Sequence, residues 1–129
     1  MRARQVSVFA ENRPGRLRDL LAALADAEIS IQALSIADSA DFGIIRMILA
    51  DTEAGQQALR DAGFTVMVNE VLAAEVPDEP GGFLNAIVAP LTDAGINVEY
   101  VYAFADNPKE QALVVLKVSD LARAEAVLG

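Results

Sequence analysis

The chain has 129 residues, of which 53% are hydrophobic, and a net charge of −9 with neither cysteine nor histidine. This length predicts one compact body, the hydrophobic content excludes a disordered chain, and the lack of an apolar run of about eighteen residues excludes a membrane-spanning helix. The acidic excess argues against nucleic-acid and anionic-membrane partners, the lack of cysteine excludes disulfides, and the lack of histidine removes the commonest general base and metal ligand.

The apolar periodicities of the first half predict six elements in the order strand–helix–strand–strand–helix–strand. They are strands at 5–10, 29–37, 42–50 and 64–68, a helix from Pro14 to about Ala27, and a helix capped by Asp51 or Thr52 and ended by Gly63. The alternation changes phase within 29–37, which predicts a bulge or a strand covered on both faces. Residues 42–50 are almost continuously apolar, which predicts a central strand, and Gly43 would permit a bulge or a close backbone approach.

The second half repeats this order. Strands are expected at 71–76, 96–105 and 111–118, with a helix from Pro80 to about Ala94 that Pro90 should kink and a last helix capped by Ser119. The sequence stops before a fourth strand of this half. Either the chain is trimmed there, or another segment fills that place in the sheet.

The two halves align as internal copies. Pro14-Gly15 matches Pro80-Gly81, Ile29-Ser30-Ile31 matches Ile96-Asn97-Val98, and Asp51 matches Asp120. The join at Val68-Asn69-Glu70-Val71 has neither glycine nor proline, so the flanking strands can run straight from one copy to the next. We therefore expect an α+β, ferredoxin-like fold of two βαββαβ units, residues 1–69 and 70–129, the second lacking its last strand.

Each Pro-Gly follows a strand and opens a helix. A strand that turns sharply into a helix leaves the first backbone N–H groups of the helix without partners, at the positive end of its dipole. Such a turn suits a carboxylate, so each half contributes the edge of a possible anion pocket.

The string Glu11-Asn12-Arg13-Pro14-Gly15-Arg16-Leu17, followed by a helix and Ile29-Ser30-Ile31, resembles the ACT domain, a regulatory ligand-binding module. The second half, with Pro80-Gly81 and Gly95-Ile96-Asn97-Val98, resembles another. The resemblance implies that a small amino acid binds between paired ACT units, from the strand–helix loop of one to the second strand of its neighbour. It also implies a homodimer and a partner enzyme of amino-acid metabolism.

By this resemblance Asn12 and Asn97 match asparagines that contact the ligand. Departures are Ala10 in place of a histidine, Ser30 in place of the first unit's second asparagine, and Asp78 in place of the second unit's first. One composite site, with Asn12 facing Asn97, is therefore favoured over two equal sites. The full candidate set is Asn12, Arg13, Pro14, Gly15, Leu17, Ser30, Asp78, Pro80, Gly81, Gly82, Asn97 and Val98.

Simpler roles stay open for several of these residues. Asn12 could cap the first helix, and Gly15 and Gly81 could serve only the turn. Arg13 could pair with a ligand carboxylate or lie in solvent. The alternating Tyr100, Tyr102 and Phe104 would pack a core, a subunit interface or a pocket wall.

The sequence thus predicts a non-catalytic amino-acid sensor, with no catalytic residues, metal or cofactor. The apolar stretch after the basic start is too short for a signal peptide, so a cytoplasmic protein is expected. The first alternative is a regulatory or assembly subunit of a metabolic enzyme without a ligand of its own. The second is a small acylphosphatase-like hydrolase, for which no anion-cradling loop with a fixed arginine is recognisable.

Overall fold

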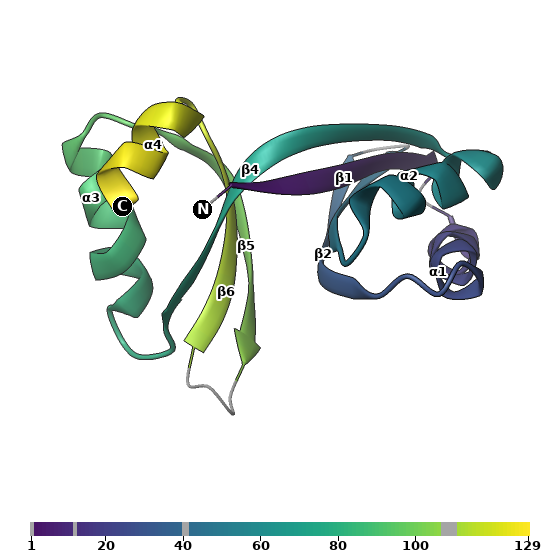
Figure 1. The fold of residues 1–129 in the computed structure, drawn as a ribbon, viewed down its shortest axis with the longest axis horizontal. Coiled ribbons are helices and arrows are strands. Elements are labelled where there is room, and N and C mark those ends of the chain that lie inside the picture. Colours follow the sequence, from purple (N-terminus) through teal and green to yellow (C-terminus); the bar gives the residue numbers. More distant parts are fainter. Residues whose placement is uncertain (1, 12, 40–41, 107–110) are drawn as a thin grey trace. The chain divides into compact units, whose positions relative to one another are not determined.

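The computed structural model describes residues 2–11, 13–39, 42–106 and 111–129 (Figure 1). The chain forms two compact units, one of Arg4–Glu70 and one of Val71–Gly129 together with Met1–Ala3. Each unit is an antiparallel sheet with helices packed on it, so the expected α+β, ferredoxin-like architecture is confirmed.

The first unit follows the predicted element order, and its strands lie in the order β2-β3-β1-β4. Its elements are β1 Arg2–Glu11, α1 Arg16–Asp26, β2 Ile31–Ser39, β3 Phe42–Leu49, α2 Thr52–Asp61 and β4 Thr65–Pro77, the last running on into the second unit. β3 pairs antiparallel with both β1 and β2, which confirms the prediction of a central strand. A register shift between Ile31 and Ala33 agrees with the first of the two alternatives predicted for the second strand, a bulge rather than a strand covered on both faces.

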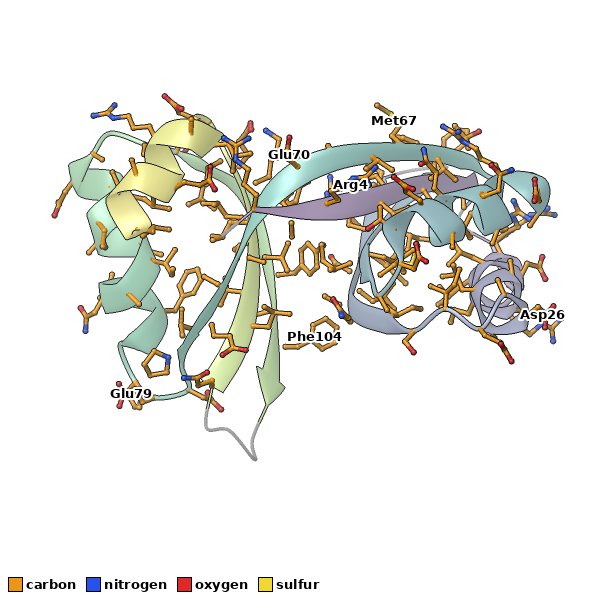
Figure 2. All side chains as sticks on the ribbon, viewed as in Figure 1. Arg4, Asp26, Met67, Glu70, Glu79 and Phe104 are labelled. Carbon is orange, nitrogen blue, oxygen red and sulfur yellow. The ribbon has the colours of Figure 1, made fainter. Side chains whose placement is uncertain are left out.

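Alternation along β1 directs Val6, Val8 and Ala10 into the core of the first unit. There they meet Leu20 and Leu24 of α1, both at most 1% exposed. The outward-facing Met67 of β4, by contrast, projects away from α1 and α2 (Figure 2). Burial of one face of the sheet under the apolar stripes of two helices is the main stabilising contribution here.

The second unit repeats this layout with the end of β4 as its first strand. The other elements are the π-helix η1 Leu84–Val88, α3 Ala89–Asp93, β5 Val98–Asp106, β6 Gln111–Val118 and α4 Leu121–Leu128. β6 pairs antiparallel with both β4 and β5. Its core comprises Leu72, Val76, Ile87, Leu91, Ile96, Val114, Leu116, Val118 and Ala124.

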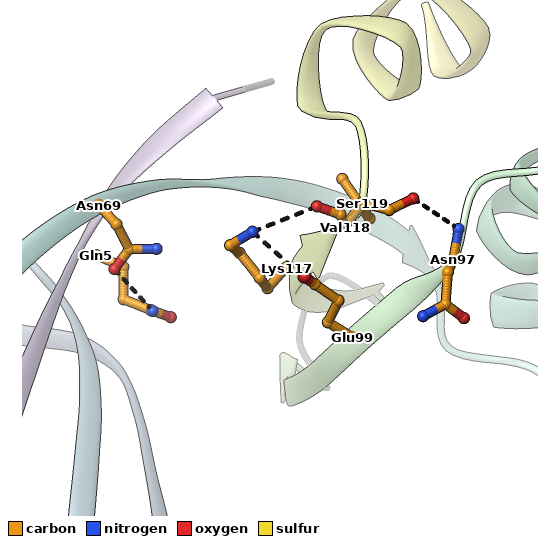
Figure 3. Close-up of polar contacts among 7 residues, drawn as sticks. All are labelled: Gln5, Asn69, Asn97, Glu99, Lys117, Val118 and Ser119. Atoms are coloured by element: carbon orange, nitrogen blue, oxygen red, sulfur yellow. Dashed lines mark hydrogen bonds and ion pairs between the residues drawn. The ribbon is translucent and has the colours of Figure 1, made fainter.

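The start of β1 takes the place of the missing fourth strand in the second unit. β1 is the neighbour of β4 in the sheet, and Arg2 and Ala3 belong to the second unit. Arg2 also forms an ion pair with Glu125 of α4. Further along the same two strands, within the first unit, Gln5 of β1 donates to the side chain of Asn69 of β4 at 3.4 Å (Figure 3). The edge of β4 is therefore paired.

The structure corrects two local predictions and adds a detail at a third position. The first helix begins at Arg16 rather than Pro14, because Gly15 before it has a left-handed φ of 94°. Asp120, not Ser119, caps the last helix by accepting from the Arg123 N–H at 3.1 Å. Pro90 follows the π-helix η1, whose wider turn gives space to the proline ring near the carbonyl four residues back. The kink expected at Pro90 stays a prediction.

The structure also shows the surroundings of Gly43 and of the aromatic residues of β5. The register continues unbroken through Gly43, and a Cβ there would meet backbone oxygens at an ordinary 3.8 Å, so neither a bulge nor a close approach explains this glycine. Tyr102 and Phe104 pair with Val115 and Leu113, on the face of β5 and β6 opposite the core of the second unit.

Candidate functional site

The loop between β1 and α1 builds the candidate site from local backbone geometry. Arg13 and Pro14 form the turn, and Gly15 precedes the helix in a conformation that L side chains rarely adopt. The Asp19 N–H donates to the Gly15 carbonyl at 2.9 Å, which closes the first turn of α1. No side chain among the described residues caps this helix with a hydrogen bond, and the Arg16 N–H donates to the Arg13 carbonyl at 3.3 Å.

A pocket of about 140 Å³ opens beside this loop, within the first unit. This volume exceeds the roughly 10–15 Å³ needed for one water molecule, so the pocket has space for a small solute. It is lined by Ala10, Glu11, Arg13, Arg16, Leu17, Ile36, Gly43 and Ile45. Its wall is therefore apolar along the sheet and charged at the loop.

The charged residues of the pocket are unequally satisfied. Arg13 Nε lies 2.9 Å from Glu11 Oε2, and both side chains are largely exposed. Arg16 Nη1 lies 3.7 Å from Asp19 Oδ2, which is beyond hydrogen-bonding distance. The guanidinium instead stacks 4.4 Å from the centre of the Phe64 ring, and its buried Nε has no hydrogen-bond partner among the described residues.

This arrangement holds the Arg16 guanidinium in place without using all of its donors. Cation–π stacking fixes its orientation. A buried donor without a hydrogen-bond partner costs about 1–3 kcal/mol, and the cost is higher when the donor belongs to a charged group. Such a group is prepared for an anion, because a carboxylate accepts two N–H bonds from a guanidinium.

Of the residues predicted for the first loop, the structure brings Arg13 and Leu17 into one pocket, with Gly15 between them in the chain. Pro14 is exposed in the turn, and Asn12 lies outside the described residues. The sequence analysis missed Glu11, Arg16, Ile36 and Ile45. One signal for Arg16 was available: a cation in the first turn of a helix opposes the helix dipole and therefore suggests a role other than helix stability.

The loop of the second unit has the same backbone but a different surface. Gly81 has a φ of 79° and accepts from the Asn85 N–H at 2.9 Å, just as Gly15 accepts from Asp19. Asp78, Glu79 and Pro80 are exposed, and Figure 2 shows Glu79 projecting from this loop. The loop thus presents two carboxylates and no cation.

Gly82 occupies the position that Arg16 has in the first loop. It is buried, and a Cβ there would lie 2.2 Å from the Pro77 carbonyl oxygen. A contact under 3.0 Å with a backbone atom requires the backbone to shift. The second loop therefore has no room for a side chain at the position where the first loop holds its arginine.

Asn97 is exposed immediately before β5, and its backbone exchanges two hydrogen bonds with Ser119. Its N–H donates to Ser119 Oγ and its carbonyl accepts from the Ser119 N–H, both at 3.0 Å (Figure 3). No described residue bonds its side-chain amide. In the first unit the carbonyl of the exposed Ser30 accepts from Ala50 in the same way, so the alignment of Ser30 with Asn97 reflects matching geometry. Val98 begins β5 and is half-buried.

Other kinds of site find no support within the described part of the chain. No group of three or more acidic, histidine or cysteine side chains is placed to hold a metal ion. No helix there is long and apolar enough to cross a membrane.

Comparisons with known proteins agree with the tandem architecture. A family model described as an ACT domain pair matches residues 1–128. A Bacteroides thetaiotaomicron protein of known crystal structure is 38% identical, with a TM-score of 0.93 over 99% of this chain and 87% of that one. No curated protein matches the sequence.

Two more distant structures share the fold. The ligand-free regulatory subunit of aspartate kinase from Thermus thermophilus is 15% identical, with a TM-score of 0.64 over 97% of this chain and 87% of that chain. Aspartokinase III from E. coli, in complex with aspartate and ADP, is 19% identical with a TM-score of 0.60, over 98% of this chain and 30% of that chain.

Proposed function

We propose, because the chain belongs to the ACT domain pair family, that it is a non-catalytic regulatory protein that binds a small amino acid. ACT domains bind amino acids for regulation. The observation that carries the proposal to this chain is the pocket at the start of α1, where the buried Arg16 Nε has no hydrogen-bond partner among the described residues. A regulatory amino acid supplies the anion that such a pocket lacks.

The remaining predicted residues belong to the second side of the proposed site. In the arrangement that the family resemblance implies, the strand–helix loop of one ACT unit faces the second strand of another. Asn97 and Val98 are the candidates on that strand, and Ser30 is the counterpart of Asn97 in the first unit. Asn12 belongs to the strand–helix loop of the first unit, which the proposed arrangement places opposite Asn97. The side-chain amide of Asn97, which bonds to no residue that the structure describes, supports this role, because an amide can both donate to a carboxylate and accept from an ammonium group.

The proposed output is control of a separate enzyme of amino-acid metabolism by a homodimer of this chain. The regulatory subunits of aspartate kinase among the structural neighbours support the general role. Control requires that the amino acid bind two conformations of the assembly unequally. The ligand is small, so an affinity between micromolar and millimolar, or about −8 to −4 kcal/mol, is expected.

A thermal-unfolding panel of the twenty amino acids tests the proposal. A ligand present at one hundred times its dissociation constant should stabilise the folded protein by about 2.7 kcal/mol. Backbone amide NMR shifts then locate the site, and the matched loops provide the control. The Gly15 and Leu17 signals should move at ligand concentrations that leave the Gly81 signal in place.

If none of the twenty amino acids changes the unfolding temperature, the sensor proposal is wrong. The alternative of an assembly subunit without a ligand would then be favoured.

A further inference from the structure

We infer that the ligand of the first-unit pocket is an α-amino acid with an apolar side chain, oriented by Arg16 and Glu11. This inference rests on the proposed function and adds the ligand class and the role of each charge. Arg16 donates to the α-carboxylate, Glu11 accepts from the α-ammonium group, and the side chain lies against Leu17, Ile36 and Ile45.

The carboxylate is assigned to Arg16 because Arg16 is the less satisfied of the two cations. The Arg13 guanidinium already pairs with Glu11 at 2.9 Å. Among the described residues the acid that pairs with Arg16 is Asp19, 3.7 Å away, whose own side chain is more than half exposed. Stacking on Phe64 orients the Arg16 guanidinium before any ligand arrives, so little side-chain entropy is lost on binding.

The ammonium group is assigned to Glu11, the acid that lines the pocket. Glu11 is the last residue of β1, and its carboxylate is more than half exposed. It can therefore accept from the ligand while keeping or exchanging its contact with Arg13. A zwitterion then adds one charge of each sign to a lining that holds the carboxylate of Glu11 and the guanidinium groups of Arg13 and Arg16.

The side chain is assigned an apolar character from the rest of the lining. Ile36 is 52% exposed even though it belongs to the helix-covered face of β2, where it pairs with the buried Ile45. An apolar ligand group that covers this half-exposed isoleucine stabilises the complex by roughly 25 cal/mol per Å² of apolar surface that it buries. Beyond Arg13 and Arg16 the lining holds no further cation, so an acidic ligand side chain would have to displace Glu11 from Arg13.

The two loops also predict one such site per chain. The second loop has Gly82 in place of Arg16, and the Pro77 carbonyl prevents a side chain there. Its exposed Asp78 and Glu79 would repel a carboxylate. The tandem repeat thus keeps the loop geometry twice and the anion-binding group once.

Titration calorimetry with valine and two truncated analogues tests each assignment separately. Isobutylamine is valine without its carboxylate, and isovalerate is valine without its ammonium group. The wild-type protein should bind valine at least 10-fold more tightly than either analogue. Valine should also bind at least 10-fold more tightly than aspartate or lysine.

Variants separate the two charged residues. Arg16→Gln should weaken valine binding at least 10-fold and leave isobutylamine binding unchanged, with Arg16→Lys intermediate. Glu11→Gln should weaken valine and isobutylamine binding and leave isovalerate no weaker. Arg18→Gln removes the same charge from the exposed side of the same helix, so it should leave all three affinities within about 2-fold.

The outcomes distinguish this inference from the proposed function. Binding of an amino acid that is not apolar, or valine binding that Arg16→Gln leaves intact, overturns the inference and keeps the sensor. Equal wild-type affinities for valine and isobutylamine overturn the carboxylate assignment without any variant. Failure of every amino acid to bind overturns both.

Discussion

Two glycines offer a direct test of how backbone and side-chain obstacles differ. A Cβ at Gly82 would lie 2.2 Å from the Pro77 carbonyl oxygen, and a Cβ at Gly55 would lie 2.3 Å from Leu49 Cδ1. The overlaps are nearly equal, but the obstacles are not. A leucine methyl can rotate away, whereas the Pro77 carbonyl also accepts from the Glu79 N–H and belongs to the last pair of the β4–β6 ladder.

Gly82→Ala should therefore be much the more destabilising change. The Cβ and the carbonyl oxygen must separate by about 1.2 Å to move from 2.2 Å to an ordinary 3.4 Å contact, which strains the turn and the strand end. Overpacking of this kind costs about 2–3 kcal/mol. In Gly55→Ala a rotamer change of Leu49 costs about 1 kcal/mol, and the gain in helix propensity of about 1 kcal/mol offsets it.

Urea unfolding followed by circular dichroism measures both variants. With a slope of about 1–3 kcal/mol per molar urea, Gly82→Ala should lower the midpoint by about 0.7–3 M, and Gly55→Ala should stay within about 0.5 M of wild type. A Gly82→Ala protein as stable as wild type would refute the reasoning. So would a Gly55→Ala protein that loses as much stability as Gly82→Ala, because the obstacle's identity would then not matter.

Asp51→Ala and Asp120→Ala should each lower the free energy of unfolding by about 1 kcal/mol in urea titrations, because each carboxylate accepts a backbone N–H at a helix start at 3.1 Å; unequal losses would show that the two caps are not equivalent. Gly15→Ala and Gly63→Ala should each lose about 1–2 kcal/mol, since both glycines have φ near 90° in open space, but only the first should change amide shifts around the pocket; a change from both would contradict a local effect. Ser119→Ala should lower the free energy of unfolding by about 0.5–1.5 kcal/mol, because the Ser119 hydroxyl accepts from the backbone N–H of Asn97. Faster hydrogen exchange at the Asn97 amide is the measurement, and unaltered exchange would show that this hydrogen bond is not formed in solution.

Local signals in the sequence were sufficient for most of the fold. The Pro-Gly pairs, the matched Asp51 and Asp120, and the phase change in the second strand each report on backbone geometry within a few residues. They predicted the repeat, one helix cap and the bulge correctly. Ser119 was misassigned because two adjacent residues can both cap a helix, and only the structure shows that Asp120 does so.

The features that sequence reasoning missed depend on residues far apart in the chain. The character of Arg16 comes from Phe64, almost fifty positions later, which holds its guanidinium in place of a hydrogen-bonding partner. The closed second loop depends on the position of the Pro77 carbonyl relative to Gly82. No periodicity or motif in the sequence marks either contact, so only the folded structure shows them.

The assignment of Arg2 and Ala3 to the unit that otherwise begins at Val71 has a practical consequence for dissecting this protein. A fragment cut at the midpoint would leave the second half with an open strand edge, which favours aggregation. It would also remove the ion pair with Glu125. A usable fragment of the second unit would need the residues around Arg2 and Ala3 restored beside β4. A bulky affinity tag placed before Arg2 would, for the same reason, disturb the second unit before the first.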